Sequence, residues 1–293
     1  GSGNFLIIAY KELRKLEMLI IHDIQALRGH QGSGSLDLGT EYLSMITLSH
    51  FYGIELDDFA HEVAILSLWL AEHQMNQAFF AAFGMSRPAL PLMETGHIVH
   101  GNACRVDWEV VCPKEKDDEI YILGNPPYLG SSLQSKEQKD DMEYVFKGID
   151  GYKNLDYIAC WFLKGTRFIS GINSQFAFVS TNSISQGEQV GILWNELLNI
   201  YKIKIHFAHR TFKWSNEARG NAAVHVVIIG FSNFDINAKR IFEYEDIRDE
   251  PHEVEAKNIN PYLVNSKDIF IKKRSKPICN VPEISRGSDA IDG

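Results

Sequence analysis

The stretch DEIYILGNPPYLG, residues 118–130, decides the fold. Its first half is an apolar run typical of a β-strand. Pro126 and Pro127 then end that strand, because proline has no N–H and fixes φ at about −65°. A residue before proline is pushed into extended backbone, so Asn125 is expected to stand at the strand's end. The loop would present an amide, a proline carbonyl and the ring of Tyr128, although an ordinary turn with a surface tyrosine is the simpler alternative.

Helices and strands are predicted to alternate around this segment. Helices are expected over about 4–29, 57–83, 133–146, 155–172 and 188–200, and strands over 48–56, 97–101, 118–125, 176–181, 203–209 and 223–231. This alternation is typical of a mostly parallel sheet covered by helices. The last two strands follow one another without a helix, which predicts an antiparallel edge strand. The fold class is therefore α/β, in which ligands bind beyond the C-terminal ends of the strands.

The composition fits a globular α/β protein without membrane helices. The chain has 293 residues, 45% of them hydrophobic, which is enough for a sizeable core. No apolar run reaches the roughly 20 residues that a membrane helix needs. Four scattered cysteines without a Cys-x-x-Cys pair are typical of free thiols in the reducing cytoplasm. No metal site is predicted, because Ile65 stands where H-E-x-x-H needs its second histidine after His61.

The net charge of −9 argues mildly against a protein that binds nucleic acid over its whole surface. Basic residues nevertheless gather between positions 202 and 219. This cluster is either a solvated face or a DNA-binding segment. Its candidate DNA contacts are Lys202, Lys204, Arg210, Lys213 and Arg219.

Further candidate ligand-binding residues stand at other predicted strand and helix ends. GSGNFL opens the chain, where glycines let a ligand approach a helix N-terminus closely. Glu55 follows the strand 48–56, and a carboxylate there can accept hydrogen bonds from both hydroxyls of a ribose. Its alternative role as a helix N-cap is already available to Asp57 or Asp58. Asn102 follows the strand 97–101, and its amide can both donate to and accept from an adenine edge.

Eight stretches together carry a family resemblance. They are GSGNFL, FYGIELDDFAHEVA, LAEHQMN, GNPPYLG, LDYIACWFL, STNSISQGEQV, HFAHRTFKWSNEARG and NINPYLV. The chain resembles the gamma-class N6-adenine DNA methyltransferases, more narrowly the methyltransferase segment of type IIL (type IIG-like) restriction–modification enzymes. The resemblance implies a Rossmann-like methyltransferase fold, S-adenosyl-L-methionine as cofactor and double-stranded DNA as partner.

The resemblance also implies roles for the strand-end residues toward the cofactor. Glu55 would hold the ribose, and Asn102 would hold the adenine. The residues at the opening of the chain would line the methionine part; these are Gly1, Gly3, Asn4 and Phe5.

Toward the substrate, Asn125 and the Pro126 carbonyl would accept the two amino hydrogens of a flipped adenine. Pro127 would stiffen the loop and Tyr128 would stack on the base, with Phe212 on its other face. Two acceptors localise the lone pair of the amine, so positioning and electrostatics would supply most of the catalysis. Extruding the base from the duplex is the usual solution for enzymes that modify it.

The chain begins at Gly1, whereas in the resembling family an acidic residue, a proline and a strand come first. We therefore expect an N-terminally truncated methyltransferase domain over 1–240 that is inactive alone, its first strand missing. A linker over 241–293 would lead to an absent target-recognition domain, with nuclease and recognition domains on the same full-length polypeptide.

Two other functions stay open. The same loop could hold the amide of a protein glutamine, as in N5-methyltransferases, although the basic segment 202–219 argues against this. The chain could also be an inactive DNA-binding or assembly module, which the intact Glu55, Asn125 and Tyr128 disfavour. The DNA target sequence would be set by the target-recognition domain.

Overall fold

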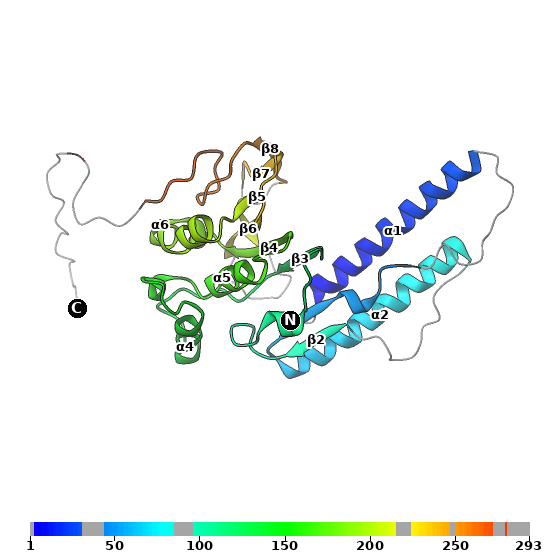
Figure 1. Ribbon diagram of the computed structural model, residues 1–293, viewed down its shortest axis with the longest axis horizontal. Helices are drawn as coiled ribbons and strands as arrows, with labels where there is room; N and C mark the ends of the chain where they lie inside the picture. The colour runs from blue at the N-terminus through cyan, green and yellow to red at the C-terminus, as the bar shows by residue number, and fades with distance from the viewer. Residues whose placement is uncertain are drawn as a thin grey trace.

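The computed structural model describes residues 3–30, 44–84, 96–214, 224–246, 250–271 and 279. It contains a small two-stranded sheet near the N-terminus and a larger six-stranded sheet (Figure 1). No helix in these ranges is long and apolar enough to cross a membrane.

The N-terminal part is built from two long helices and the small sheet. Helices α1 (Asn4–His30) and α2 (Asp58–Phe83) lie side by side (Figure 1). Strands β1 (Tyr52–Glu55) and β2 (His97–His100) pair in parallel. A separate apolar cluster holds this part together, with Tyr10, Leu48 and Leu68 fully buried.

Local capping sets the ends of α2. The Asp57 side chain accepts the N–H of Ala60 at 2.8 Å and begins the helix, as an N-cap residue does. Gly84 ends it with φ at 73°, a left-handed conformation that glycine adopts without a Cβ clash.

The large sheet has the strand order β3-β4-β6-β5-β7-β8. Its strands are β3 (Ile120–Gly124), β4 (Ser174–Thr181), β5 (Lys204–Trp214), β6 (Val224–Ser232), β7 (Lys239–Glu243) and β8 (His252–Ala256). The pairings make β3, β4, β5 and β7 run in one direction and β6 and β8 in the other. The predicted α/β fold with a mostly parallel sheet is confirmed.

The antiparallel strand that follows β5 lies inside the sheet, whereas the sequence predicted it at the edge. Strand β6 is inserted between β4 and β5, and β7 and β8 extend the sheet beyond β5. Its residues Val226, Val227, Ile229 and Phe231 are all buried. A near-continuous apolar run is typical of a strand covered on both faces, so this strand could not lie at an exposed edge.

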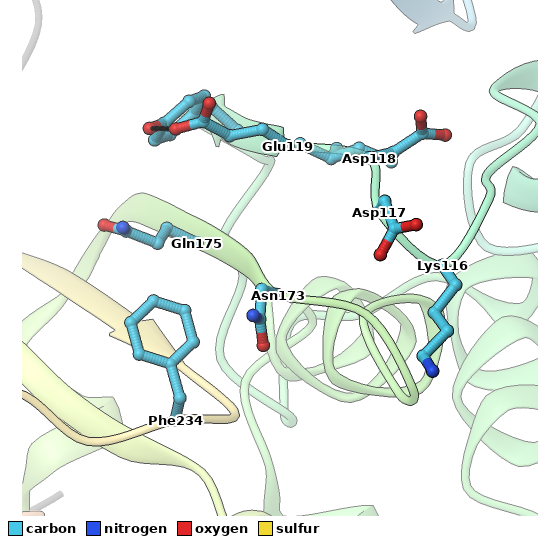
Figure 2. Close-up of a pocket in the computed structure, with 9 residues that line it drawn as sticks. Lys116, Asp117, Asp118, Glu119, Asn173, Gln175 and Phe234 are labelled. Atoms are coloured by element: carbon cyan, nitrogen blue, oxygen red, sulfur yellow. Dashed lines mark hydrogen bonds between the residues drawn. The ribbon is translucent and has the colours of Figure 1, made fainter.

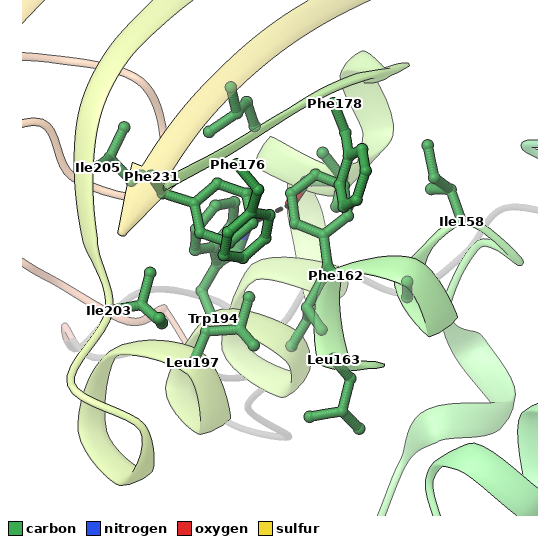
Figure 3. Packing of buried hydrophobic residues seen from close by; sticks show 14 of the residues in the cluster. Ile158, Phe162, Leu163, Phe176, Phe178, Trp194, Leu197, Ile203, Ile205 and Phe231 are labelled. Carbon is green, nitrogen blue, oxygen red and sulfur yellow. Dashed lines mark hydrogen bonds between the residues drawn. The ribbon is translucent and has the colours of Figure 1, made fainter. Parts of the chain in front are cut away.

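Helix α5 (Ala159–Phe168) packs on the large sheet and fills the main core (Figure 3). The ring of Phe162 stacks on Phe231 of β6 at 5.3 Å between centroids and meets Trp194 edge-on. Trp194 lies in a helical segment that begins as α6 (Gly187–Gln189) and continues through wider π-type turns over Val190–Trp194 and Glu196–Ile200.

Helix α4 (Lys136–Val145) forms the predicted helical insertion after the two prolines. The Ser135 side chain accepts the N–H of Gln138, and the Gln138 side chain accepts the N–H of Ser135, which completes a capping box.

Most predicted helices and strands are found, with shifted ends. A 3₁₀ turn at Leu48–His50 replaces the first part of the predicted strand 48–56. Another at Tyr152–Asn154 precedes α5, which begins four residues later than predicted. The short helix α3 (Trp108–Val111) was not predicted from the sequence.

Candidate functional site

The Asn-Pro-Pro-Tyr loop leaves β3 at the C-terminal edge of the large sheet. Gly124 is the last residue paired with β4, opposite Phe178. Pro126 is buried, whereas Asn125 is exposed and has no hydrogen-bond partner among the residues that the structure describes. Tyr128 is half-buried against the main core. The loop therefore presents a free amide beside an anchored proline and a partly exposed ring.

Hydrogen bonds at Leu129 fix the far end of this loop. Its N–H donates to Asp156 Oδ1 at 2.8 Å, and its carbonyl accepts from the N–H of Tyr157 and from Gln134 Nε2, both at 3.0 Å. The same Asp156 oxygen accepts the N–H of Ile158 at 3.2 Å. One buried carboxylate thus ties the loop to the start of α5.

Asp156 is 3% exposed, and burial raises the pKa of its carboxyl above the ordinary value. The bonds from Ile158, Leu129 and the Thr181 hydroxyl oppose that rise without cancelling it. Because Thr181 ends β4, the carboxyl also links the loop to the neighbouring strand.

Asn102, the predicted adenine-binding residue, lies just after β2 and heads a tight turn. Its side-chain oxygen accepts the N–H of Cys104 at 2.8 Å, and its carbonyl accepts the N–H groups of Arg105 and Val106. Its amide nitrogen donates to Asp141 Oδ2 at 2.8 Å. An asparagine amide has two donors and two acceptor positions. One of each remains for a ligand.

Asp141 lies on α4 and is 4% exposed. It accepts hydrogen bonds from Asn102, from the Tyr157 hydroxyl at 2.7 Å and from Arg105 Nε. Burial alone would raise the pKa of Asp141, but these bonds outweigh it and hold the pKa below its ordinary value. Burial likewise raises the pKa of Tyr157, so this hydroxyl stays a donor.

Glu55 lies at the end of β1, beside the end of β2. Its carbonyl accepts the N–H of Gly101 at 2.8 Å, which brings Glu55 close to Asn102. Its half-exposed side chain accepts the N–H of Asp57 at 3.1 Å. Asp57 caps α2, as the sequence allowed, and Glu55 in turn supports Asp57.

Gly3 precedes α1 with φ at 76°, and a Cβ there would lie 3.0 Å from the Cβ of Ala64. The close approach of α1 to α2 is therefore enough to require this glycine. Asn4 begins α1 and Phe5 is 38% exposed. Gly1 lies outside the described residues.

Phe212 lies near the end of β5, at the same edge of the sheet as the Asn-Pro-Pro-Tyr loop. It pairs with Val226, which also pairs with Thr181, so Phe212 is level with the end of β4. Two strands stand between β3 and β5, a lateral separation of about 14 Å at ordinary strand spacing. The side chain of the rival residue Trp214 lies outside the described part.

The ring of Phe212 is partly engaged within the protein. It stacks on Tyr244 at 5.2 Å, and the Tyr244 hydroxyl lies 2.8 Å from His209 Nδ1. His209 stacks on Phe242 of β7 at 4.2 Å, and burial lowers its pKa. The structure therefore holds Phe212 at the edge of an aromatic cluster and does not bring it into contact with Tyr128.

The basic candidates that the structure describes are spread along β5 and do not form one patch. Lys202 is exposed just before β5, and Lys204 begins it, at the sheet edge opposite the Asn-Pro-Pro-Tyr loop. Arg210 is paired with Glu243 at 2.8 Å, and Lys213 is half-buried near the C-terminal end of β5. Arg219 lies outside the described residues.

A pocket of about 320 Å³ opens at the other edge of the sheet (Figure 2). It is lined by Lys116, Asp117, Asp118, Glu119, Asn173, Gln175 and Phe234, among others. These residues surround the N-terminal ends of β3 and β4, away from the loop. The pocket is therefore not the candidate active site.

A second pocket, of about 450 Å³, contains three cations, but each is already engaged. Arg105 bonds Asp141, Lys164 donates to the carbonyls of Cys104 and Val106, and Arg167 donates to the Tyr201 hydroxyl and the Val145 carbonyl. These three side chains therefore bond within the fold, and the described pocket carries no proposal for an anion site.

Sequence reasoning missed Asp141, Asp156 and Tyr157. Asp141 could have been found from its place on α4, because it lies on the buried face of that helix with Met142 and Val145. A buried aspartate needs hydrogen-bond donors inside the protein, so its position indicated a hydrogen-bond network.

Comparisons with known proteins identify a family and a related fold for this chain. Residues 1–243 match the family described as MmeI, DNA-methyltransferase domain. DNA methyltransferase A of Bacillus subtilis (strain 168) is 47% identical over the whole chain, which covers 32% of that protein. The solved structure of the type IIL restriction–modification enzyme MmeI in complex with DNA aligns with a TM-score of 0.83 and 45% identity, over 96% of this chain and 37% of that one. The chain thus spans about a third of the length of these relatives.

Proposed function

Because the chain belongs to the MmeI DNA-methyltransferase domain family, we propose that it methylates N6 of an adenine flipped out of double-stranded DNA. The methyl donor would be S-adenosyl-L-methionine, and the domain would act within a restriction–modification enzyme. The B. subtilis relative is named a DNA methyltransferase, and the MmeI structure is a complex with DNA. Both support DNA as the substrate.

The single observation that carries the adenine assignment is the Asn-Pro-Pro-Tyr loop. The exposed Asn125 amide has one carbonyl oxygen free to accept a hydrogen bond, and Pro126 is anchored beside it by burial. Leu129 fixes the loop through bonds to Asp156, Tyr157 and Gln134. A loop fixed in this way can hold two acceptors in one geometry, which preorganised catalysis requires.

Each residue of the loop has a distinct part in the proposed reaction. Asn125 Oδ1 and the Pro126 carbonyl would accept the two amino hydrogens of the base and aim its lone pair. The half-buried Tyr128 would support one face of the ring, since only part of it packs on the core. Phe212 would come to the other face, and for that its contact with Tyr244 must loosen or reorient. Holding the reacting atoms in line supplies a large share of such a rate enhancement.

The strand ends beside β1 and β2 fit the cofactor. Bound S-adenosyl-L-methionine would supply an electrophilic methyl group. Asn102 keeps one donor and one acceptor position, the pair that an adenine edge needs. Glu55 is half-exposed next to it and can accept from ribose hydroxyls. Gly3, with φ at 76°, lets α1 approach α2 closely next to these strand ends, because it has no Cβ to meet Ala64.

The test is transfer of labelled methyl groups by the protein expressed from its complete reading frame. Label should appear in DNA as N6-methyladenine. Asn125→Ala should reduce the rate by roughly 10²–10³, as expected when one preorganised polar group is lost. Asn199→Ala, at another exposed asparagine, is the matched control and should change little.

The outcomes separate the candidate functions. Label in protein would indicate the glutamine methyltransferase instead, and label in cytosine would contradict the adenine assignment. Near-normal turnover by Asn125→Ala would contradict the catalytic role of the Asn-Pro-Pro-Tyr loop.

A further inference from the structure

We propose that Asp141 is a positioning residue, which presents the Asn102 amide to the adenine of the cofactor and links it to the target-base loop. The inference rests on the proposed function, because it gives Asn102 a role toward S-adenosyl-L-methionine. It concerns a helix, α4, that contributes no residue to the loop or the strand ends themselves.

The first step is the orientation of the Asn102 side chain. An amide can rotate by half a turn and exchange its donor and acceptor ends. Here the oxygen is held by the N–H of Cys104 and the nitrogen by Asp141. A carboxylate accepts hydrogen bonds only, so Asp141 fixes the nitrogen end and prevents the exchange. The remaining donor and acceptor are thereby kept in a fixed order for an adenine edge.

The second step is the reason for a carboxylate rather than an apolar side chain. Asp141 is 4% exposed and faces three donors, from Asn102, Arg105 and Tyr157. A buried charge is tolerated only when paired and hydrogen-bonded, and these donors meet that need. Hydrogen bonds to a charged group are roughly twice as strong as neutral ones, which stiffens the amide's orientation.

The third step is the connection to the Asn-Pro-Pro-Tyr loop. Tyr157 donates its hydroxyl to Asp141 Oδ2 at 2.7 Å and its main-chain N–H to the Leu129 carbonyl at 3.0 Å. One residue therefore joins Asp141 to the end of the loop. We expect a displacement of Asn102 or Asp141 to reach the loop through the hydroxyl and the main-chain N–H of this residue.

A double-mutant cycle on cofactor affinity tests the proposal. Calorimetry with S-adenosyl-L-methionine is performed on the protein expressed from its complete reading frame, for Asp141→Asn, Asn102→Ala and the double variant. Asp141→Asn should weaken binding by about 10-fold or more, as expected for a lost charged hydrogen bond. In the Asn102→Ala background it should cause no further loss, because Asp141 acts through Asn102.

Two controls accompany the cycle. Asp140→Asn makes the same chemical change at the neighbouring exposed aspartate of α4 and should leave affinity within about twofold, as surface changes do. Tyr157→Phe keeps the ring and the bond to Leu129 and removes only the hydroxyl, so it should weaken cofactor binding even if Asp141→Asn folds poorly.

Equal affinities for Asp141→Asn and Asp140→Asn, or additive losses in the double variant, would overturn the inference while the proposed function stands. The inference would also be overturned if the wild type methylates DNA and Tyr157→Phe leaves the affinity for S-adenosyl-L-methionine unchanged. Absence of cofactor binding by the wild type would overturn the proposed function, and this inference with it.

Discussion

Replacing Asp156 separates the hydrogen bonds that hold the target-base loop from the charge that comes with them. Asp156→Ala removes the acceptor for the N–H groups of Leu129 and Ile158, at 2.8 and 3.2 Å. Asp156→Asn keeps that oxygen, and its new amide hydrogens can donate to the Thr181 hydroxyl, which already contacts the carboxyl. The two variants differ in the bonds and share the loss of charge.

Two hydrogen bonds to a charged group are worth about 1.5–3 kcal/mol each. The carboxyl is 3% exposed, and its burial opposes ionisation, which offsets part of that value. We expect Asp156→Ala to lower the free energy of unfolding by about 3 kcal/mol, a large part of a typical total. Asp156→Asn should stay within about 1 kcal/mol of wild type at pH 7. Asp156→Ala removes one of the three hydrogen bonds that hold the loop at Leu129, so its methylation rate should fall by roughly 10².

The pH dependence has a definite sign. The pKa of Asp156 is raised by burial, so its contribution to stability is fully present below the unfolded value of about 3.9. That contribution is lost as pH rises through the raised pKa. The loss in free energy of unfolding caused by Asp156→Asn should therefore be largest near pH 4 and smallest near pH 7.

Urea unfolding at several pH values, with methylation of DNA measured alongside, checks these expectations. Asn154→Ala, near the same segment but at an exposed side chain, is the control. If Asp156→Ala unfolds with less than about 1 kcal/mol of loss and methylates normally, the loop does not depend on this carboxyl and the reasoning fails.

Three further results are expected. Phe212→Ala should weaken binding to duplex DNA more than to DNA with the target adenine mismatched, by up to about 1–3 kcal/mol for one lost stack; equal 2-aminopurine flipping signals for wild type and variant would reassign that role. Gly3→Ala should lower the melting temperature, because φ at 76° and a Cβ 3.0 Å from Ala64 both oppose a side chain; an unchanged melting curve would contradict the close approach. Asp141→Asn should lower the free energy of unfolding most above about pH 4 and progressively less below that pH. The pKa of Asp141 is lowered in the folded protein, so the stability contributed by its charge disappears as the pH falls through that pKa. A loss of stability that is independent of pH would show that the charge is unimportant.

The sequence predicted the fold well because its signals are local. Alternating apolar runs indicated the strands, and Asp57 and Gly84 mark the ends of α2 through their own side-chain and backbone chemistry. The position of β6 was missed for a different reason. The short connection between β5 and β6 shows that these strands are neighbours, but not which of them lies next to β4. That order depends on the burial of both faces of β6, which is a property of the whole sheet.

The candidate site was predictable where a residue follows the end of a strand, as Glu55 and Asn102 do, or acts by its own conformation. The prolines at 126 and 127 fix their loop wherever they occur, so Asn125 could be placed at the strand's end. Asp141 and Tyr157 act through contacts between segments far apart in the sequence, which no spacing rule reveals. The described residues of the basic cluster are separated, because an 11-residue strand carries its two ends to opposite edges of the sheet.

The strand order also has a consequence for the path of folding. Trp214 of β5 pairs with Val224 of β6 across a short connection, whereas Ile120 of β3 pairs with Ser174 of β4 across the two α-helices α4 and α5. Closing a longer loop costs more chain entropy before any contact offsets it, and this slows parallel pairing. We therefore expect the β5–β6 hairpin to form early and β3 to join late. Amide hydrogens beside the Asn-Pro-Pro-Tyr loop should then be among the last to gain protection from exchange during refolding.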